Sequence, residues 1–116
     1  MKRFIHTPAQ GDLVWLDFLP QAGHEQSGRR PAVILSPIAY NKKLGLALVC
    51  PVTRQAKGYP FEVALPDSLP VTGVVLSDHL KSLDWRARRA EFIAKLDEST
   101  LTAILQRART LLTSEP

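Results

Sequence analysis

Residues 25–35 read Glu25-Gln26-Ser27-Gly28-Arg29-Arg30-Pro31-Ala32-Val33-Ile34-Leu35, and within this stretch a polar loop becomes an apolar strand. Pro31 biases Arg30 toward extended backbone and removes one strand donor, which suits the first residue of a strand and not its centre. Arg30 is therefore predicted to lie where a polar loop enters a rigid sheet. A planar guanidinium held at such a point is well suited to bind phosphate oxygens.

Length and composition limit the class of protein. With 116 residues, 45% hydrophobic and 22% charged, the chain is expected to fold as a single domain over residues 1–116. No apolar run approaches the roughly 20 residues of a membrane span, and nothing resembles a signal peptide, so we expect a cytoplasmic protein with no membrane association. Cys50 is the only cysteine and follows apolar residues, which predicts a buried thiol and no intrachain disulfide.

The net charge of +4 is unevenly distributed along the chain. Residues 1–57 carry eight Lys or Arg against three acidic residues, whereas residues 58–116 carry seven against eight. A surface that meets phosphates is expected to be positive, and the first half of the chain fits that expectation. A solvated surface with uneven charge gives the same count, so the motifs must decide between the two.

Short apolar segments separated by turns with proline and glycine predict a mainly β fold, either a barrel or a sandwich. The expected strands are residues 11–18, 32–36, 46–52, 61–65, 71–76, 82–88 and 91–96, with a turn at residues 40–45. The exception is a C-terminal helix, for which Asp97 is the predicted N-cap and an apolar stripe runs from Leu101 to Leu112. This helix is expected to cover an open side of the barrel.

The motifs that are absent narrow the chemistry. The three histidines have no paired metal-ligand spacing, and the sequence contains no Gly-rich nucleotide loop and no nucleophile elbow, so no metal or cofactor is expected. The remaining chemistry is metal-free cleavage of an RNA phosphodiester, which needs a proton acceptor, a proton donor and stabilisation of the developing phosphorane charge. Arg30 can supply that charge, Thr53 can hydrogen-bond a non-bridging oxygen, and Glu25 can accept the proton.

Other side chains are candidates for RNA binding. Arg29, Arg54 and Lys57 can guide the RNA backbone, while Phe18 or Tyr59 can stack on an unpaired base. From the residues alone, each of these assignments has a plain structural alternative. Thr53 can be an ordinary strand-end threonine, Glu25 a solvated loop acid, and the aromatic residues part of the core or its rim.

The order of several motifs resembles the MazF/PemK family of toxin endoribonucleases. The matching segments are Gly11-Asp12-Leu13-Val14-Trp15-Leu16-Asp17-Phe18, residues 25–36, Pro51-Val52-Thr53, Lys57-Gly58-Tyr59-Pro60-Phe61-Glu62-Val63 and residues 78–86. The five segments follow the family's order from about residue 10 to residue 90. The Arg-Pro dipeptide alone would carry almost no information, but five ordered motifs form a specific pattern.

The resemblance implies an SH3-like β-barrel of the CcdB/PemK type with a C-terminal helix, which forms a homodimer. It implies a toxin of a type II toxin–antitoxin system that cleaves single-stranded mRNA at specific sequences without the ribosome, inhibiting translation and growth. The predicted products of the metal-independent route are 2′,3′-cyclic phosphate and 5′-hydroxyl ends. The implied partner is a cognate MazE-like antitoxin whose disordered, acidic tail covers the basic groove.

By motif position, Arg30 and Thr53 match the family's catalytic pair, and Glu25 matches the loop acid linked to catalysis. The residues expected to bind RNA are Phe18, Gln26, Arg29, Arg54, Lys57, Tyr59, Asp78 and Lys81. Arg54 and His79 depart from residues that are frequent in the family, and these departures bear on which base sequence is recognised.

The alternative is a toxin of the same fold, like CcdB, that poisons DNA gyrase by binding. That family reads its target through an aromatic-glycine-aliphatic C-terminus, whereas this chain ends Leu111-Leu112-Thr113-Ser114-Glu115-Pro116. The pair Arg30 and Thr53 would be unnecessary for such a function. A catalytically inactive barrel used only for binding is a third alternative that the sequence does not separate.

Overall fold

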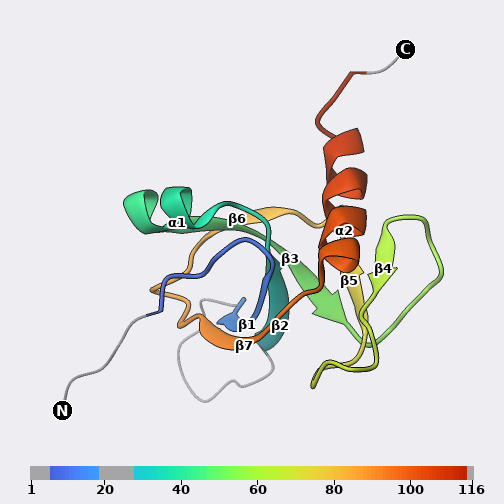
Figure 1. The fold of residues 1–116 in the computed structure, drawn as a ribbon, viewed down its shortest axis with the longest axis horizontal. Helices are drawn as coiled ribbons and strands as arrows, with labels where there is room; N and C mark the ends of the chain where they lie inside the picture. The colour runs from blue at the N-terminus through green and yellow to red at the C-terminus, as the bar shows by residue number, and fades with distance from the viewer. Residues whose placement is uncertain (1–5, 19–27, 115–116) are drawn as a thin grey trace.

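The computed structural model describes residues 6–18 and 28–114, and Figure 1 shows how this part of the chain is arranged. Its elements are β1 (Asp12–Asp17), β2 (Arg29–Ile34), α1 (Ile38–Leu44), β3 (Leu46–Thr53), β4 (Glu62–Ala64), β5 (Val74–Leu76), β6 (Lys81–Asp84), β7 (Glu91–Lys95) and α2 (Glu98–Thr110). Neither helix in these ranges is both long enough and apolar enough to cross a bilayer.

The strands form one antiparallel sheet in the order β4-β5-β3-β2-β1-β7, and β6 also pairs with β3. The eight-residue strand β3 organises this sheet, since it pairs with β2, β5 and β6 at different points along its length. The prediction of a mainly β fold with a C-terminal helix is confirmed. The sheet is not closed, however, because its two ends, β4 and β7, do not pair, so the expected barrel is open.

The central strands are buried on both faces. Side chains alternate across a strand, so Leu13 joins one hydrophobic cluster while Val14 and Leu16, on the same strand, join the other. The first cluster includes Ile104 and Ala108, so α2 covers that face. The second cluster is built around Trp85, which is 1% exposed. This two-sided burial explains why β1, β3 and the second half of β2, residues 32–34, read as almost continuous apolar runs.

The C-terminal helix begins as the sequence predicts. The Asp97 carboxylate accepts hydrogen bonds from the Thr100 N–H (3.0 Å), the Thr100 hydroxyl (2.7 Å) and the Ser99 hydroxyl (3.0 Å). The bonds from Thr100, the largest cause, and Ser99 stabilise the charged form and lower the pKa of Asp97. The N-cap prediction is confirmed.

The prediction of a turn at residues 40–45 is wrong, because Ile38–Leu44 is the helix α1. Asn41 explains the difference. Its side chain is fully buried, donating to the Pro8 carbonyl (2.8 Å) and accepting from the Ser36 hydroxyl (2.5 Å), and its own carbonyl accepts from the Trp85 indole (2.9 Å). These partners lie outside the segment, so its local turn composition does not reveal them. The strand expected at residues 82–88 is also shorter, since β6 ends at Asp84.

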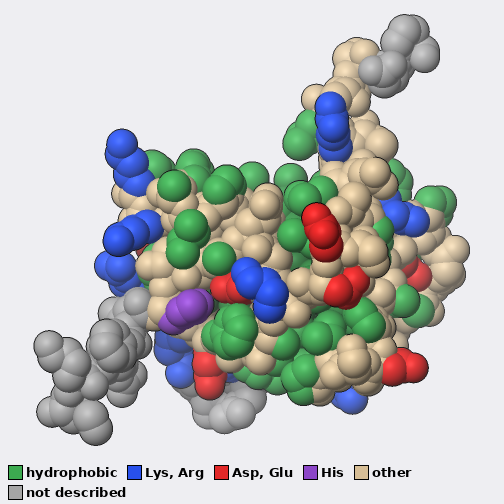
Figure 2. All heavy atoms as spheres, viewed as in Figure 1, with side chains coloured by type: hydrophobic (Ala, Val, Ile, Leu, Met, Phe, Trp, Pro, Cys, Tyr) green, Lys and Arg blue, Asp and Glu red, His purple; other side chains and the backbone are tan. Residues whose placement is uncertain are grey.

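Apolar side chains reach the surface in several places, and Figure 2 shows them on one face of the molecule, between its charged groups. The large exposed ones are Ile38, Tyr40, Leu44, Phe92, Leu111 and Leu112. Leu111 and Leu112 follow α2 and continue its apolar stripe beyond the part that packs on the sheet. The stripe predicted for the C-terminal helix is therefore only partly covered within the described chain.

Candidate active site

A pocket opens where the ladder between β2 and β3 stops. The Leu35 N–H donates to the Leu48 carbonyl of β3 (2.8 Å), and because backbone groups on a strand alternate, Val33 and Pro31 turn the same edge toward β3. Pro31 has no N–H and cannot extend the ladder, and pairing with β3 ends at Ala32 and Pro51. The residues of β2 before Ala32 and those of β3 after Pro51 therefore lie at the mouth of an opening.

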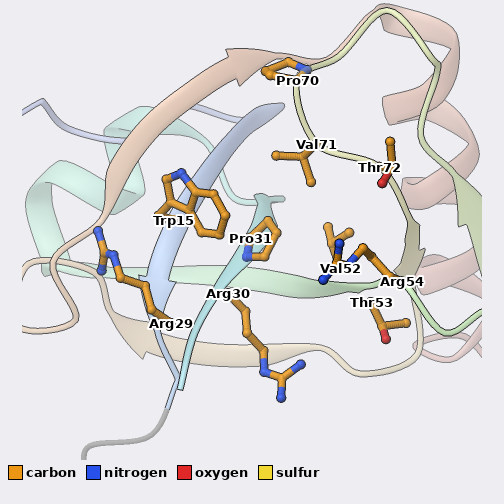
Figure 3. Close-up of a pocket in the computed structure, with 10 residues that line it drawn as sticks. All are labelled: Trp15, Arg29, Arg30, Pro31, Val52, Thr53, Arg54, Pro70, Val71 and Thr72. Carbon is orange, nitrogen blue, oxygen red and sulfur yellow. The ribbon is translucent and has the colours of Figure 1, made fainter. Parts of the chain in front are cut away.

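This pocket has a volume of about 460 Å³ and carries two kinds of lining (Figure 3). Its lining residues are Trp15, Arg29, Arg30, Pro31, Val52, Thr53, Arg54, Pro70, Val71 and Thr72. Three of them are arginines, and none of the described lining residues is acidic. A concave site with apolar walls and a few convergent cations matches an anionic ligand that also has a flat, apolar part.

Arg30 and Thr53 both line this pocket. They are 23 positions apart in sequence, but continuing the β2–β3 register by two residues places Arg30 opposite Thr53. Arg30 is exposed, and no acidic side chain of the described residues lies within salt-bridge distance of it. Its guanidinium is therefore available to an anionic ligand without first breaking an ion pair to any residue that the structure describes.

The Thr53 hydroxyl is oriented by the loop that follows it. Its oxygen accepts the Gln55 N–H at 3.1 Å, so the hydroxyl hydrogen remains available to donate. On its other side, the backbone of Gly73 approaches so closely that an added Cβ would lie 2.5 Å from the Thr53 carbonyl oxygen. The φ angle of Gly73 is +139°, a value that residues with a side chain rarely adopt. The position of Thr53 thus depends on a glycine.

Arg29 lines the same pocket but is differently engaged. Its guanidinium donates to Asp17 (2.9 Å) and Glu91 (3.0 Å), and in Figure 3 it points away from the guanidinium of Arg30. Adjacent residues on a strand point to opposite faces, which accounts for the divergence. The hydrogen bond from Arg89, together with the one from Arg29, lowers the pKa of Asp17 despite partial burial. The predicted RNA-binding role of Arg29 is therefore limited by an existing ion pair.

Tyr59 and Asp78 contact each other instead of the pocket. The Tyr59 hydroxyl donates to the Asp78 carboxylate at 2.8 Å. This hydrogen bond is the main cause that raises the pKa of Tyr59 to about 12. The Tyr59 hydroxyl hydrogen is thus engaged by Asp78, and the ring of Tyr59 is the part that can stack on a base.

The remaining predicted site residues are dispersed. Arg54 lines the pocket, whereas Lys57 and Lys81 are exposed and do not line it. Phe18 is half-buried and packs against the cluster around Trp85, which makes it a rim residue of the core. Glu25 and Gln26 lie outside the described residues.

Sequence reasoning did not select several residues of the lining. The missed residues are Trp15, Pro31, Val52, Pro70, Val71 and Thr72. Trp15 and Pro31 are cross-strand partners, so they form one wall together. The sequence does hint at Trp15, because β1 is apolar on both faces and a residue as large as tryptophan is hard to bury completely between close-packed strands. The sequence gives no such hint for residues 70–72, because only the tertiary structure brings this segment next to the pocket.

Burial also settles the state of the thiol. Cys50 is fully buried, and this burial, with a smaller effect of the Asp78 charge, raises its pKa to about 12. Its thiol therefore stays protonated at neutral pH and is a poor nucleophile. The prediction of a buried thiol is confirmed.

The family model for PemK-like, MazF-like toxins of type II toxin–antitoxin systems matches residues 9–112. The chain belongs to this family. A 54% identity over 85 residues relates it to the endoribonuclease toxin MazF of Escherichia coli K12, covering 73% of this chain and 76% of that protein. The crystal structure of MazF from Deinococcus radiodurans is 57% identical and superposes with a TM-score of 0.85, over 93% of this chain and 98% of that one.

A second structure from Deinococcus radiodurans contains MazF together with MazE. It is 51% identical to this chain, with a TM-score of 0.83 over 93% of this chain and 97% of that one. These relatives agree with the MazF/PemK resemblance seen in the sequence. The alternative of a CcdB-like gyrase poison is not favoured.

The contact between Gly73 and Thr53 gives a test of the site's architecture. We expect Gly73→Ala to destabilise the fold by about 3 kcal/mol, because a strained φ and a collision with the Thr53 backbone act together. Gly58→Ala is the matched control, since Gly58 has φ +81° and nothing within 4 Å of an added Cβ. It should cost only about 1 kcal/mol. Urea unfolding measures both variants, and equal losses would contradict the proposed close approach.

The hydrogen bond between Tyr59 and Asp78 predicts a raised pKa for the Tyr59 phenol, which a pH titration can test. In a Tyr40→Phe background, which leaves Tyr59 as the only tyrosine, the phenolate absorbance should rise only near pH 12. Asp78→Asn removes the carboxylate that favours the neutral phenol, so the pKa of Tyr59 should fall toward the ordinary value of about 10. Asp84→Asn, which removes an acid that does not contact Tyr59, should leave it unchanged. A pKa unaffected by Asp78→Asn would show that the hydrogen bond does not form.

Proposed function

We propose that this chain is a sequence-specific, metal-independent endoribonuclease toxin that cleaves single-stranded mRNA. The observation that carries the proposal is a pocket lined both by Arg30, which has no ionic partner among the described residues, and by Thr53, whose hydroxyl hydrogen is available to donate. Family membership supports the activity class, since the E. coli relatives are named endoribonucleases. The assignment of roles to residues rests on geometry and chemistry.

In the proposed reaction the RNA 2′-hydroxyl attacks the adjacent phosphorus, and the bond to the 5′-oxygen breaks. Glu25 takes the 2′-proton, and solvent water gives a proton to the leaving 5′-oxygen, so the products are a 2′,3′-cyclic phosphate and a 5′-hydroxyl. A guanidinium does not readily lose a proton, so Arg30 stabilises the negative charge that develops on the phosphorane oxygens. The Thr53 hydroxyl donates to a non-bridging oxygen.

The residues around Arg30 and Thr53 are proposed to contact the rest of the RNA. Arg54 adds a second cation at the pocket, and the apolar wall formed by Trp15 and Pro31 accepts a flat base beside the phosphate. Lys57, Lys81 and the Tyr59 ring extend the contact outside the pocket. In this proposal Arg29 adds to the positive electrostatic potential around the pocket more than it contacts the RNA directly, because it is paired with Asp17 and Glu91.

The proposal includes the assembly and its control. A toxin of this class acts in the cytoplasm, where mRNA is present, as one toxin domain over residues 1–116 and as a homodimer. A MazE-like antitoxin, such as the one in the Deinococcus complex, neutralises it. An acidic tail fits a pocket that holds three arginines and no acidic residue among its described lining.

Arg30→Ala should lower kcat/KM for RNA cleavage by about 100- to 1,000-fold, the usual cost of removing a group that stabilises transition-state charge. The assay uses a long RNA in EDTA with mapping of the ends. Arg109→Ala, which removes an exposed arginine of α2 away from the pocket, is the charge-matched control and should retain activity. Cleavage that survives in Arg30→Ala, or that EDTA abolishes in the unmodified protein, would refute the mechanism.

A further inference from the structure

Asp17, at the end of β1, holds two arginines that come from distant parts of the chain. Its carboxylate accepts from Arg29 Nη1 (2.9 Å) at the start of β2. It also accepts from Arg89 Nε (2.7 Å) and Nη2 (3.2 Å), in the turn before β7. One carboxylate thus joins three segments at the edge of the pocket, and bidentate contacts of this kind fix geometry as well as charge.

Further bonds tie the same three segments together. Arg29 also donates to the Arg89 carbonyl (3.0 Å), and the Arg88 guanidinium donates to the carbonyls of Asp17 and Phe18. Arg89 has a φ of +54°, the one positive φ of a non-glycine residue among the described residues. Such a backbone is costly and persists only where surrounding contacts impose it. The ion pair with Asp17 is a contact of this kind.

The consequence for the pocket follows from strand geometry. Arg29 and Arg30 are adjacent on β2, so their side chains point to opposite faces. Asp17 fixes Arg29 on one face, which leaves Arg30 on the other, the face that the continued β2–β3 register also gives to Thr53. In Figure 3 the guanidinium groups of Arg29 and Arg30 diverge. Asp17 also neutralises part of the charge of Arg29, so that Arg30 and Arg54 are the arginines of the pocket that have no ionic partner among the described residues.

We propose that Asp17 is a positioning residue for RNA cleavage: its ion pairs with Arg29 and Arg89 orient Arg30 and prevent Arg29 from competing with it for the phosphate. The inference rests on the proposed function and extends it to a residue that does not touch the reacting atoms. In this proposal Asp17 acts through Arg29. The two neighbouring arginines then have different roles, since Arg29 is part of the structure that positions the site and Arg30 binds the phosphate.

A structural role for Asp17 makes a different prediction from a positioning role. If Asp17 only stabilises the fold, its loss lowers the folded fraction and leaves RNA binding per folded molecule unchanged. If it positions, Asp17→Asn leaves Arg29 with only its pair to the exposed Glu91, so Arg29 can turn to the RNA phosphate, and RNA binds at least as tightly while the reaction slows. The salt dependence of binding separates the two, because each additional phosphate contact with single-stranded RNA steepens the slope of log K against log salt by about 0.7.

The experiment compares the unmodified protein, Asp17→Asn and the charge-matched control Glu98→Gln, an exposed acid in the first turn of α2. A short RNA that contains the mapped cut site gives kcat and KM in EDTA. The same oligonucleotide with a 2′-deoxy sugar at the cut position gives the dissociation constant over a range of salt concentrations. Hydrogen exchange at the Phe18 N–H, which donates to the Gly28 carbonyl at 2.8 Å, reports the position of the strand ends without reference to activity.

We expect Asp17→Asn to lower kcat by about 10- to 100-fold, with KM unchanged or lower, since a misplacement near 1 Å costs about that much. Its salt slope should steepen by about 0.7, and Phe18 should exchange faster. Glu98→Gln should match the unmodified protein in every measurement. If Asp17→Asn does not fold, Arg89→Gln replaces it, because that side chain is 70% exposed. It should lower kcat without steepening the salt slope, since Arg29 stays paired.

Several outcomes would overturn the inference. A kcat for Asp17→Asn equal to that of the unmodified protein would do so, as would a loss of rate with an unchanged salt slope and unchanged Phe18 exchange. An unmodified protein that binds the RNA but does not cut it would instead refute the proposed function. In that case the salt slope and the exchange rate still decide whether Asp17 restrains Arg29.

Discussion

The site depends on a hydrogen bond that cannot form. Pro31 turns its nitrogen toward β3 at the position where the ladder would continue, and without an N–H the pairing stops at Ala32. On the opposite edge of β3, pairing with β5 continues through Val52 and Thr53. The end of β3 is therefore held in place by one neighbour and left open toward the other. A pocket with rigid walls results, and its two key side chains come from strands that have separated only at their ends.

Charge then distinguishes the arginines that this opening brings together. Three arginines line the pocket, and the repulsion between their positive charges would be costly without a counter-charge. Asp17 and Glu91 balance Arg29 from outside the lining, whereas Arg30 and Arg54 have no ionic partner among the described residues. The arrangement resembles a general feature of binding sites, in which some charges build the site and others are kept free for the ligand. Partial burial of Arg29 and Asp17, whose side chains are 24% and 27% exposed, shields the ion pair between them from salt.

The parts of the fold and of the site that depend on interactions between residues close in sequence could be predicted from the sequence alone. Pro31 predicts an extended Arg30 through its own ring, and Asp97 predicts a helix start through a bond three residues away. The remainder depends on distant partners. The helix α1 depends on contacts between Asn41 and Pro8 and Trp85, and no local pattern contains them. The ion pair between Asp17 and Arg89 joins residues 72 positions apart.

The central claim is that Arg30 and Thr53 act on the same phosphodiester in the same step. A double-mutant cycle with Arg30→Ala, Thr53→Val and the combined variant tests it through single-turnover cleavage rates of one RNA substrate. Groups that act as a unit are strongly non-additive, so the combined variant should be little slower than the slower single variant. Rate losses that multiply fully would mean that the guanidinium and the hydroxyl act independently, and would contradict this account.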